Sequence, residues 1–317
     1  MRTINTDLAL EAHEYYVGDA PKSQLPDGIE TENSHHKNIN ITHVRVTNEN
    51  GEKLLQKKRG TYITLEIENI SPDYTDETAE KILGENISQM LKKHSVKSDA
   101  PIFVVGLGNH NITPDALGPK AVSKLDITRH LFEFLPSALE KDQRPVCAIA
   151  PGVLGNTGIE TGEIVQAICE KIKPAALIVI DALASRSTER VGKTLQLADT
   201  GIHPGSGVGN RRRGITADLT GVPVIALGVP TVVNAATIAD DAIEQTIKSM
   251  HEFGAGEYTG VISELQDDER YKLIHHSLGD MADMMVTPKE IDNIISGIST
   301  VVANGINLGL KNLQTRI

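Results

Sequence analysis

Short runs of apolar residues alternate with amphipathic stretches from residue 101 onward. The apolar runs each end at a glycine, proline or aspartate, as buried strands do, and they span residues 102–105, 146–150, 175–180 and 222–227. Apolar positions recur at helical spacing over residues 160–172, 235–253 and 288–313. This alternation predicts an α/β fold over residues 101–317, with a mostly parallel sheet and helices on both faces.

The first hundred residues are more polar and carry a different pattern. Turn-forming residues predict a loop at residues 19–36 and a turn at residues 50–51. Apolar–polar alternation predicts strands at residues 41–47 and 60–70, and helical spacing predicts a helix at residues 76–93. We therefore expect a smaller N-terminal β-containing region over residues 8–100, which precedes the α/β core.

Composition narrows the classes of function. Apolar residues make up 39% and charged residues 23% of the 317 residues, which suits a folded globular chain. Aromatic residues make up 3% and the formal net charge is −11, so we expect no direct contact with nucleic acid. No apolar signal core or run of roughly 18 apolar residues is present, which predicts a cytoplasmic protein without a membrane partner. The two cysteines, Cys147 and Cys169, fit a reducing compartment.

Two acidic residues follow predicted strands, at the edge where open α/β sheets bind ligands. Asp115 lies in a Thr-Pro-Asp sequence, and Asp181 directly follows the apolar run 175–180. Each has a structural alternative, because Asp115 could cap the next helix and Asp181 could cap a turn or pair with Arg186. Held in one crevice, the two carboxylates would form a general acid and a general base for attack of water on an amide.

Other kinds of site find less support in the sequence. A metal site that combines Asp181 with His203 and Asp199 is conceivable, but no ligand spacing such as His-Glu-x-x-His enforces it. The turn Gly106-Leu107-Gly108 lacks the third glycine of a dinucleotide-binding loop, since Asn111 stands in its place. We therefore predict no metal and no other cofactor.

A cluster of arginines follows a glycine-rich loop. Arg211, Arg212 and Arg213 follow residues 205–209, which alternate glycine with other residues. The arginines could simply belong to a solvated loop, or their guanidinium groups could bind an acidic side chain of a substrate. Arg186, Arg211 and Arg212 are accordingly our candidate substrate-binding residues.

Several long motifs, read in order, resemble the germination protease family of endospore-forming bacteria. They include Thr-Asp-Leu-Ala-Leu-Glu-Ala from Thr6, Thr-Pro-Asp-Ala-Leu-Gly-Pro around Asp115 and Asp-Ala-Leu-Ala-Ser-Arg-Ser from Asp181. Further motifs lie at residues 106–109, 128–132, 151–153, 157–161, 201–210, 228–233 and 285–290. Because the motifs extend over nearly the whole chain, chance similarity is a poor explanation for them.

The resemblance implies an activity and its residues. Members of this family are endopeptidases that degrade the small acid-soluble proteins coating spore DNA. They are treated as unusual aspartic peptidases, and their two catalytic aspartates match Asp115 and Asp181 here. The fold would resemble the hydrogenase maturation peptidases, whose cleft binds a metal. A metal-dependent peptidase with the same aspartates as ligands, with or without His203, therefore stays an alternative, as does a relative that binds spore protein without cutting it.

The resemblance also implies a mode of production. Family members are made as inactive zymogens, assemble as homotetramers and remove a short propeptide themselves. The propeptide would be residues 1–7, cut between Asp7 and Leu8, where the local sequence is similar to the cut sites of spore-protein substrates. The expected location is the cytoplasm of the forespore and the spore core.

Overall fold

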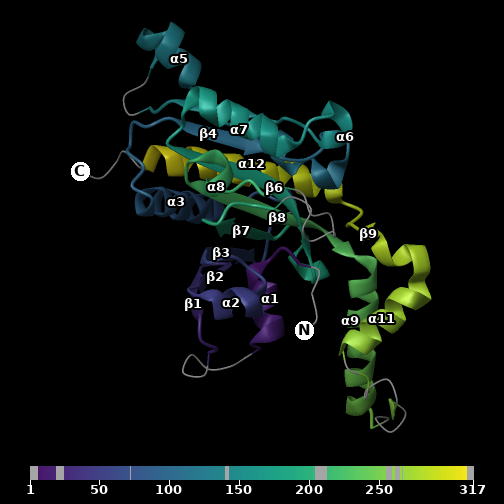
Figure 1. The fold of residues 1–317 in the computed structure, drawn as a ribbon. Helices are drawn as coiled ribbons and strands as arrows, with labels where there is room; N and C mark the ends of the chain where they lie inside the picture. Colours follow the sequence, from purple (N-terminus) through teal and green to yellow (C-terminus); the bar gives the residue numbers. More distant parts are fainter. Residues whose placement is uncertain are drawn as a thin grey trace.

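A single sheet organises the chain in the computed structural model, which describes residues 6–18, 25–71, 73–139, 143–203, 213–254, 259–260, 265 and 267–312 (Figure 1). Its nine strands follow the order β1-β2-β3-β7-β8-β6-β4-β5, and β9 pairs with β8. The strands are β1 (Ile29–His36), β2 (Ile39–Val46), β3 (Gly60–Ile67), β4 (Ile102–Gly106), β5 (Val146–Ile149), β6 (Ala176–Ser185), β7 (Thr194–Ala198), β8 (Val224–Asn234) and β9 (Met285–Val286).

The sheet is mixed, so the prediction of a mostly parallel sheet is wrong. The four predicted apolar strands do pair in parallel, in the order β8, β6, β4 and β5. Strand β7 pairs antiparallel with both β8 and β3, and β3 continues antiparallel to β2 and β1. The strands on either side of residue 100 therefore belong to one sheet, because β7 returns from the core and joins them.

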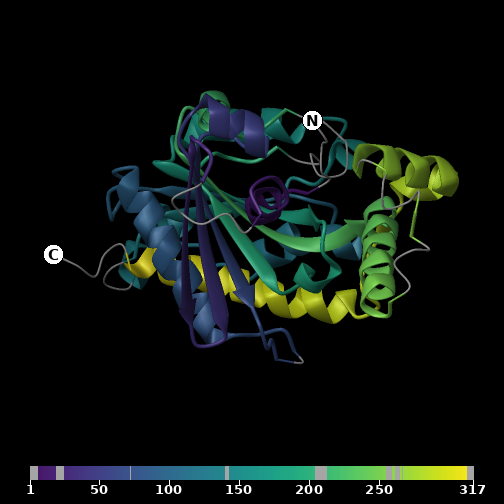
Figure 2. The ribbon, with the colours of Figure 1, turned by 90° about the horizontal axis from the view of Figure 1, so that it is seen from below.

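Helices cover both faces of the sheet, as the sequence predicts (Figure 2). On one face, α3, α4 and α12 pack over the sheet from β2 across to β5. On the other face, α7 packs on the parallel strands, while α1 and α2 pack on the antiparallel strands. The helices are α1 (Ala9–Tyr16), α2 (Glu49–Leu55), α3 (Glu77–Lys93), α4 (Leu117–Val122), α5 (Arg129–Phe134), α6 (Leu154–Thr157), α7 (Thr161–Ile172), α8 (Ala217–Thr220), α9 (Ala235–Glu252), α11 (Asp267–Leu278) and α12 (Ile291–Asn312).

Helix α12 is long and apolar enough, by length and composition, to cross a membrane. In the fold it packs against α3 and α4, and Ile295, Ile298 and Val302 along it are fully buried. Burial on most sides accounts for the apolar composition of this helix, since a helix without a solvent-facing stripe belongs to a core.

Two predictions in the N-terminal region are corrected by the structure. Residues 29–36, which we expected in a loop, form β1, whose side chains are mostly exposed and therefore carry no apolar alternation. The expected turn at residues 50–51 is the first turn of α2, where the Asn48 side chain accepts hydrogen bonds from the backbone N–H groups of Asn50 and Gly51. An N-capping asparagine here explains why a turn signal opens a helix.

Candidate active site

The candidate active site forms where β6 extends beyond its neighbour β4. Strand β4 ends at Gly106, and the N–H of Leu107 makes a last bond to the carbonyl of Ile180 at 2.8 Å. Strand β6 continues to Ser185, so the predicted strand end at Asp181 lies within it. A cavity of about 450 Å³ opens beside this extension, and its lining includes the loops after β4 and β5. This is the carboxyl edge of the parallel strands, where the sequence predicts that Asp115 and Asp181 lie.

Asp115 reaches the cavity from the loop after β4. It ends a short 3₁₀ turn (Thr113–Asp115), and its Oδ2 accepts the N–H of Asn109 at 2.7 Å. Gly108 makes this loop possible, because it has a φ of +112° and a Cβ there would lie 1.9 Å from the Asp115 carbonyl oxygen. Ala116, and not Asp115, holds the N-cap position of the following helix α4.

Asp181 lines the same cavity from inside β6 and is 7% exposed. Its Oδ1 accepts the N–H of Ala182 at 3.0 Å. Arg186 does not pair with Asp181, because its guanidinium group lies against carboxylates of α9 and contacts Asp241 at 2.8 Å. The fold therefore brings Asp115 and Asp181 to one cavity, although 65 residues of chain separate them.

The N-terminal segment contributes to the wall of this cavity, because Asp7 lines it together with the two other aspartates. The N–H of Asp7 donates to the Ala184 carbonyl at 2.9 Å, and the N–H of Ala184 donates to Asp7 Oδ2 at 2.9 Å. Leu8 follows with no exposed surface, and α1 begins at Ala9. The expected propeptide bond between Asp7 and Leu8 therefore lies next to β6, and the two hydrogen bonds between Asp7 and Ala184 hold it there.

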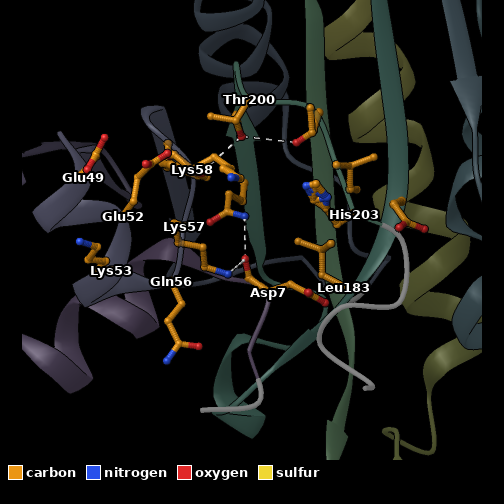
Figure 3. A pocket seen from close by; sticks show the side chains of 18 residues that line it. Asp7, Glu49, Glu52, Lys53, Gln56, Lys57, Lys58, Leu183, Thr200 and His203 are labelled. Carbon is orange, nitrogen blue, oxygen red and sulfur yellow. Dashed lines mark hydrogen bonds between the residues drawn. The ribbon is translucent and has the colours of Figure 1, made fainter. Parts of the chain in front are cut away.

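A second cavity of about 770 Å³ adjoins the first, and Asp7, Asp181 and Leu183 line both. Figure 3 shows this second cavity, with Lys57 pointing toward Asp7. The Lys57 ammonium group donates to the carbonyl oxygens of Asp7 at 2.9 Å and Thr6 at 3.2 Å. The sequence analysis missed Lys57, because a basic residue between a helix and a strand gives no pattern that marks a site.

His203 lies across the second cavity from Lys57 (Figure 3). Burial lowers the pKa of its imidazole, and the charges of Lys58 and Lys57 lower it further, against the opposing effect of Asp7. Asp199, the other candidate partner, instead bonds Lys93 at 2.7 Å. Within the described ranges, no three His, Cys, Asp or Glu side chains are grouped so that they could hold a metal ion.

Of the candidate substrate-binding arginines the structure describes Arg186, which lines neither cavity at the aspartates. Arg186 lines a third cavity with residues of α1 and α9, and it stacks over the Tyr15 ring with its guanidinium carbon 5.1 Å from the ring centroid. Arg211 and Arg212 lie outside the described residues. Their neighbour Arg213 lines the cavity that holds Asp115. A role for these arginines in substrate binding stays a prediction.

Both cysteines are structural, as the sequence predicts. Cys169 is buried in α7, and burial raises the pKa of its thiol to about 11. Cys147 lies in β5, and burial raises the pKa of its thiol too. Neither side chain lines the cavities at the aspartates, so a cysteine nucleophile has no support in this fold.

Comparison with known proteins identifies relatives along nearly the whole chain. The profile of a peptidase family described as germination protease matches residues 9–256 and 254–315. A germination protease of Clostridium tetani (strain Massachusetts / E88) is 45% identical over 314 residues, which cover 98% of this chain and 96% of that protein. Those of Clostridium acetobutylicum (strain ATCC 824) and Bacillus subtilis (strain 168) are each 42% identical, covering 98% and 97% of this chain and 96% and 93% of the relatives.

Proposed function

The chain belongs to the germination protease family, a family of spore-germination peptidases, and we propose from this that it is the endopeptidase that initiates degradation of small acid-soluble spore proteins. The observation that carries the proposal is the meeting of Asp115, Asp181 and Asp7 at one cavity. Asp115 and Asp181 line the cavity that Asp7 also lines, and the bond after Asp7 follows an acidic residue, which is the sequence feature that the family's substrates share. No cofactor enters the proposed reaction.

The proposed reaction adds water to the carbonyl carbon of that bond. One carboxylate, from Asp115 or Asp181, takes a proton from water as the new C–O bond forms and the carbonyl π electrons move to oxygen. The electron pair on oxygen then re-forms the C=O bond as the C–N bond breaks, and the other carboxyl group gives its proton to the leaving nitrogen. The products are a carboxylic acid and an amine. The two aspartates have then exchanged protonation states, and one proton exchange with water returns each of them to its starting state.

A purified small acid-soluble spore protein, incubated with the processed enzyme and followed by mass spectrometry, tests this function. We expect cuts directly after acidic residues, unchanged by a metal chelator. Cuts that chelator abolishes and one metal restores would instead make Asp115 and Asp181 metal ligands. Binding of the spore protein without any cut would make the chain a binding relative and would contradict the proposal.

Self-processing at the bond between Asp7 and Leu8 is the second part of the proposed function. The Asp7 carboxylate accepts the N–H of Ala184, so an acidic side chain at this position fixes the bond against β6. Replacing Asp7 with Ala removes that hydrogen bond, which contributes a free energy of about 1.5–3 kcal/mol when the acceptor is charged. We therefore expect slower loss of residues 1–7. Intact-mass measurement over time checks this, and an Asp7→Ala chain that shortens at the same bond and rate would count against the signal.

The remaining parts of the proposed function follow from family membership. The protein assembles as a homotetramer, acts in the cytoplasm of the forespore and in the spore core, and meets DNA only through the spore proteins it cuts. The net charge of −11 agrees with the absence of direct contact with DNA. The proposed resemblance of the fold to hydrogenase maturation peptidases stays a prediction.

A further inference from the structure

The carbonyl oxygen of Asp7 receives two side-chain hydrogen bonds in the uncut chain. Lys57 Nζ donates to it at 2.9 Å, and Gln196 Nε2 donates to it at 3.2 Å (Figure 3). Lys57 follows α2 and Gln196 lies on β7, so the two donors come from elements far apart in the chain. This oxygen belongs to the peptide bond between Asp7 and Leu8.

The rest of this peptide bond is fixed on both sides. On the acyl side, Asp7 makes the two hydrogen bonds to Ala184 described above. On the amine side, the Leu8 N–H donates to the Thr6 hydroxyl at 3.1 Å, and the Ala9 N–H donates to Gln196 Oε1 at 2.6 Å. The bond from Ala9 orients the Gln196 amide, because its oxygen is engaged and its NH₂ group is thereby directed to the Asp7 carbonyl.

We propose that Lys57 and Gln196 form an oxyanion hole for cleavage of the bond between Asp7 and Leu8. This inference rests on the proposed self-processing. As water adds to the carbonyl carbon, the electron pair of the C=O π bond moves to the oxygen that Lys57 and Gln196 already contact. The negative charge that develops there faces an ammonium group and an amide donor before the reaction begins, so little reorganisation is needed. Lys57 is thus a catalytic residue in addition to the two aspartates.

A purely structural role for Lys57 is the competing explanation. A buried carbonyl needs only a neutral donor, which Gln196 already supplies. Burial lowers the pKa of Lys57, against the opposing effect of the nearby carboxylates of Asp7 and Glu11, so a lysine is a costlier donor at this position than a neutral side chain would be. A latch that only held the N-terminal segment closed would slow processing, and its removal would speed processing up. The oxyanion hole predicts instead that removing Lys57 slows processing down.

The test is the rate at which the full chain loses residues 1–7, followed by intact mass. For Lys57→Met we expect a rate lower by about 10²–10³-fold, the usual effect of removing one oxyanion donor. Lys58→Met is the matched control, because Lys58 is exposed, lines the same cavity and has no hydrogen bond to the Asp7 carbonyl. We expect it to process within about threefold of the parent, since one exposed charge without a hydrogen bond to the reacting carbonyl changes the barrier by under about 1 kcal/mol.

A second variant separates chemistry from folding. Lys57→Cys should process as slowly as Lys57→Met, and alkylation with bromoethylamine, which restores an ammonium group at that position, should recover most of the rate. The treated parent is the control for modification elsewhere. A Lys57→Met chain that processes at the parent's rate or faster, or a Lys57→Cys chain that alkylation does not rescue, overturns the oxyanion hole. If the parent itself never loses residues 1–7, the proposed self-processing fails, and the oxyanion hole fails with it.

Discussion

Replacing Asp115 or Asp181 with Asn is expected to lower the rate of spore-protein cleavage by about 10²–10⁴-fold, the usual contribution of a general acid or base. Asparagine preserves the size of the side chain and keeps an oxygen that accepts the N–H of Asn109 or Ala182. The loop after β4 and the extension of β6 should therefore keep their positions. What the variants lose is the ability to take up or release a proton at the cavity.

The double variant sharpens this prediction. Because both groups serve one proton-transfer sequence, Asp115→Asn combined with Asp181→Asn should be little slower than either single variant. Asp218→Asn is the matched control, since Asp218 is exposed on α8 and lines neither cavity at the aspartates. Initial rates on spore protein and the elution volume of each variant are measured together. A single variant that cleaves at the parent's rate with an unchanged elution volume would contradict the acid–base pair.

The sequence predicted the parallel half of the sheet and its helices well. Fully buried strands read as unbroken apolar runs, and the four runs correspond to β4, β5, β6 and β8. Helix α3 was predicted to within a residue, because Asp76 caps it and Lys92 and Lys93 end it. The loops after these strands carry Asp115 and residues 152–162, so the edge of the sheet that holds the cavity was also predictable.

The antiparallel half and the donors to Asp7 were not predictable by the same means. Strand β7 is only five residues long, and its sequence, TLQLA, sits between turns, so it gives a weak signal. Yet this strand joins the two halves of the sheet and carries Gln196. The approach of Lys57 to Asp7 depends on tertiary packing over 50 residues of sequence, which no local pattern records.

A second large effect is expected at Arg190, which anchors α1 against the core. Its guanidinium group contacts Glu14 at 2.6 Å, Glu66 at 2.8 Å and Glu11 at 3.3 Å. The Glu11 side chain is 2% exposed, so Arg190→Met leaves a buried carboxylate without its main countercharge. Breaking a buried pair from one side typically lowers stability by about 3–5 kcal/mol. We expect the lower end, because Glu11 keeps the N–H groups of Arg186 and Ser187 as donors.

This loss of stability should affect the N-terminal segment at the site, because Glu11 lies in the first turn of α1, which begins two residues after Asp7. Thermal unfolding should show a fall in Tm of roughly 6 °C, at about 2 °C per kcal/mol for a chain of this length. Limited proteolysis should cut residues 6–18 earlier than in the parent, since α1 loses an anchor. Arg45→Met is the matched control: Arg45 pairs with Glu30 at 2.8 Å, but both side chains are more than half exposed, so the expected change is within about 0.5 kcal/mol. Equal Tm values for the two variants would show that the Arg190 cluster does not hold the N-terminal segment in place.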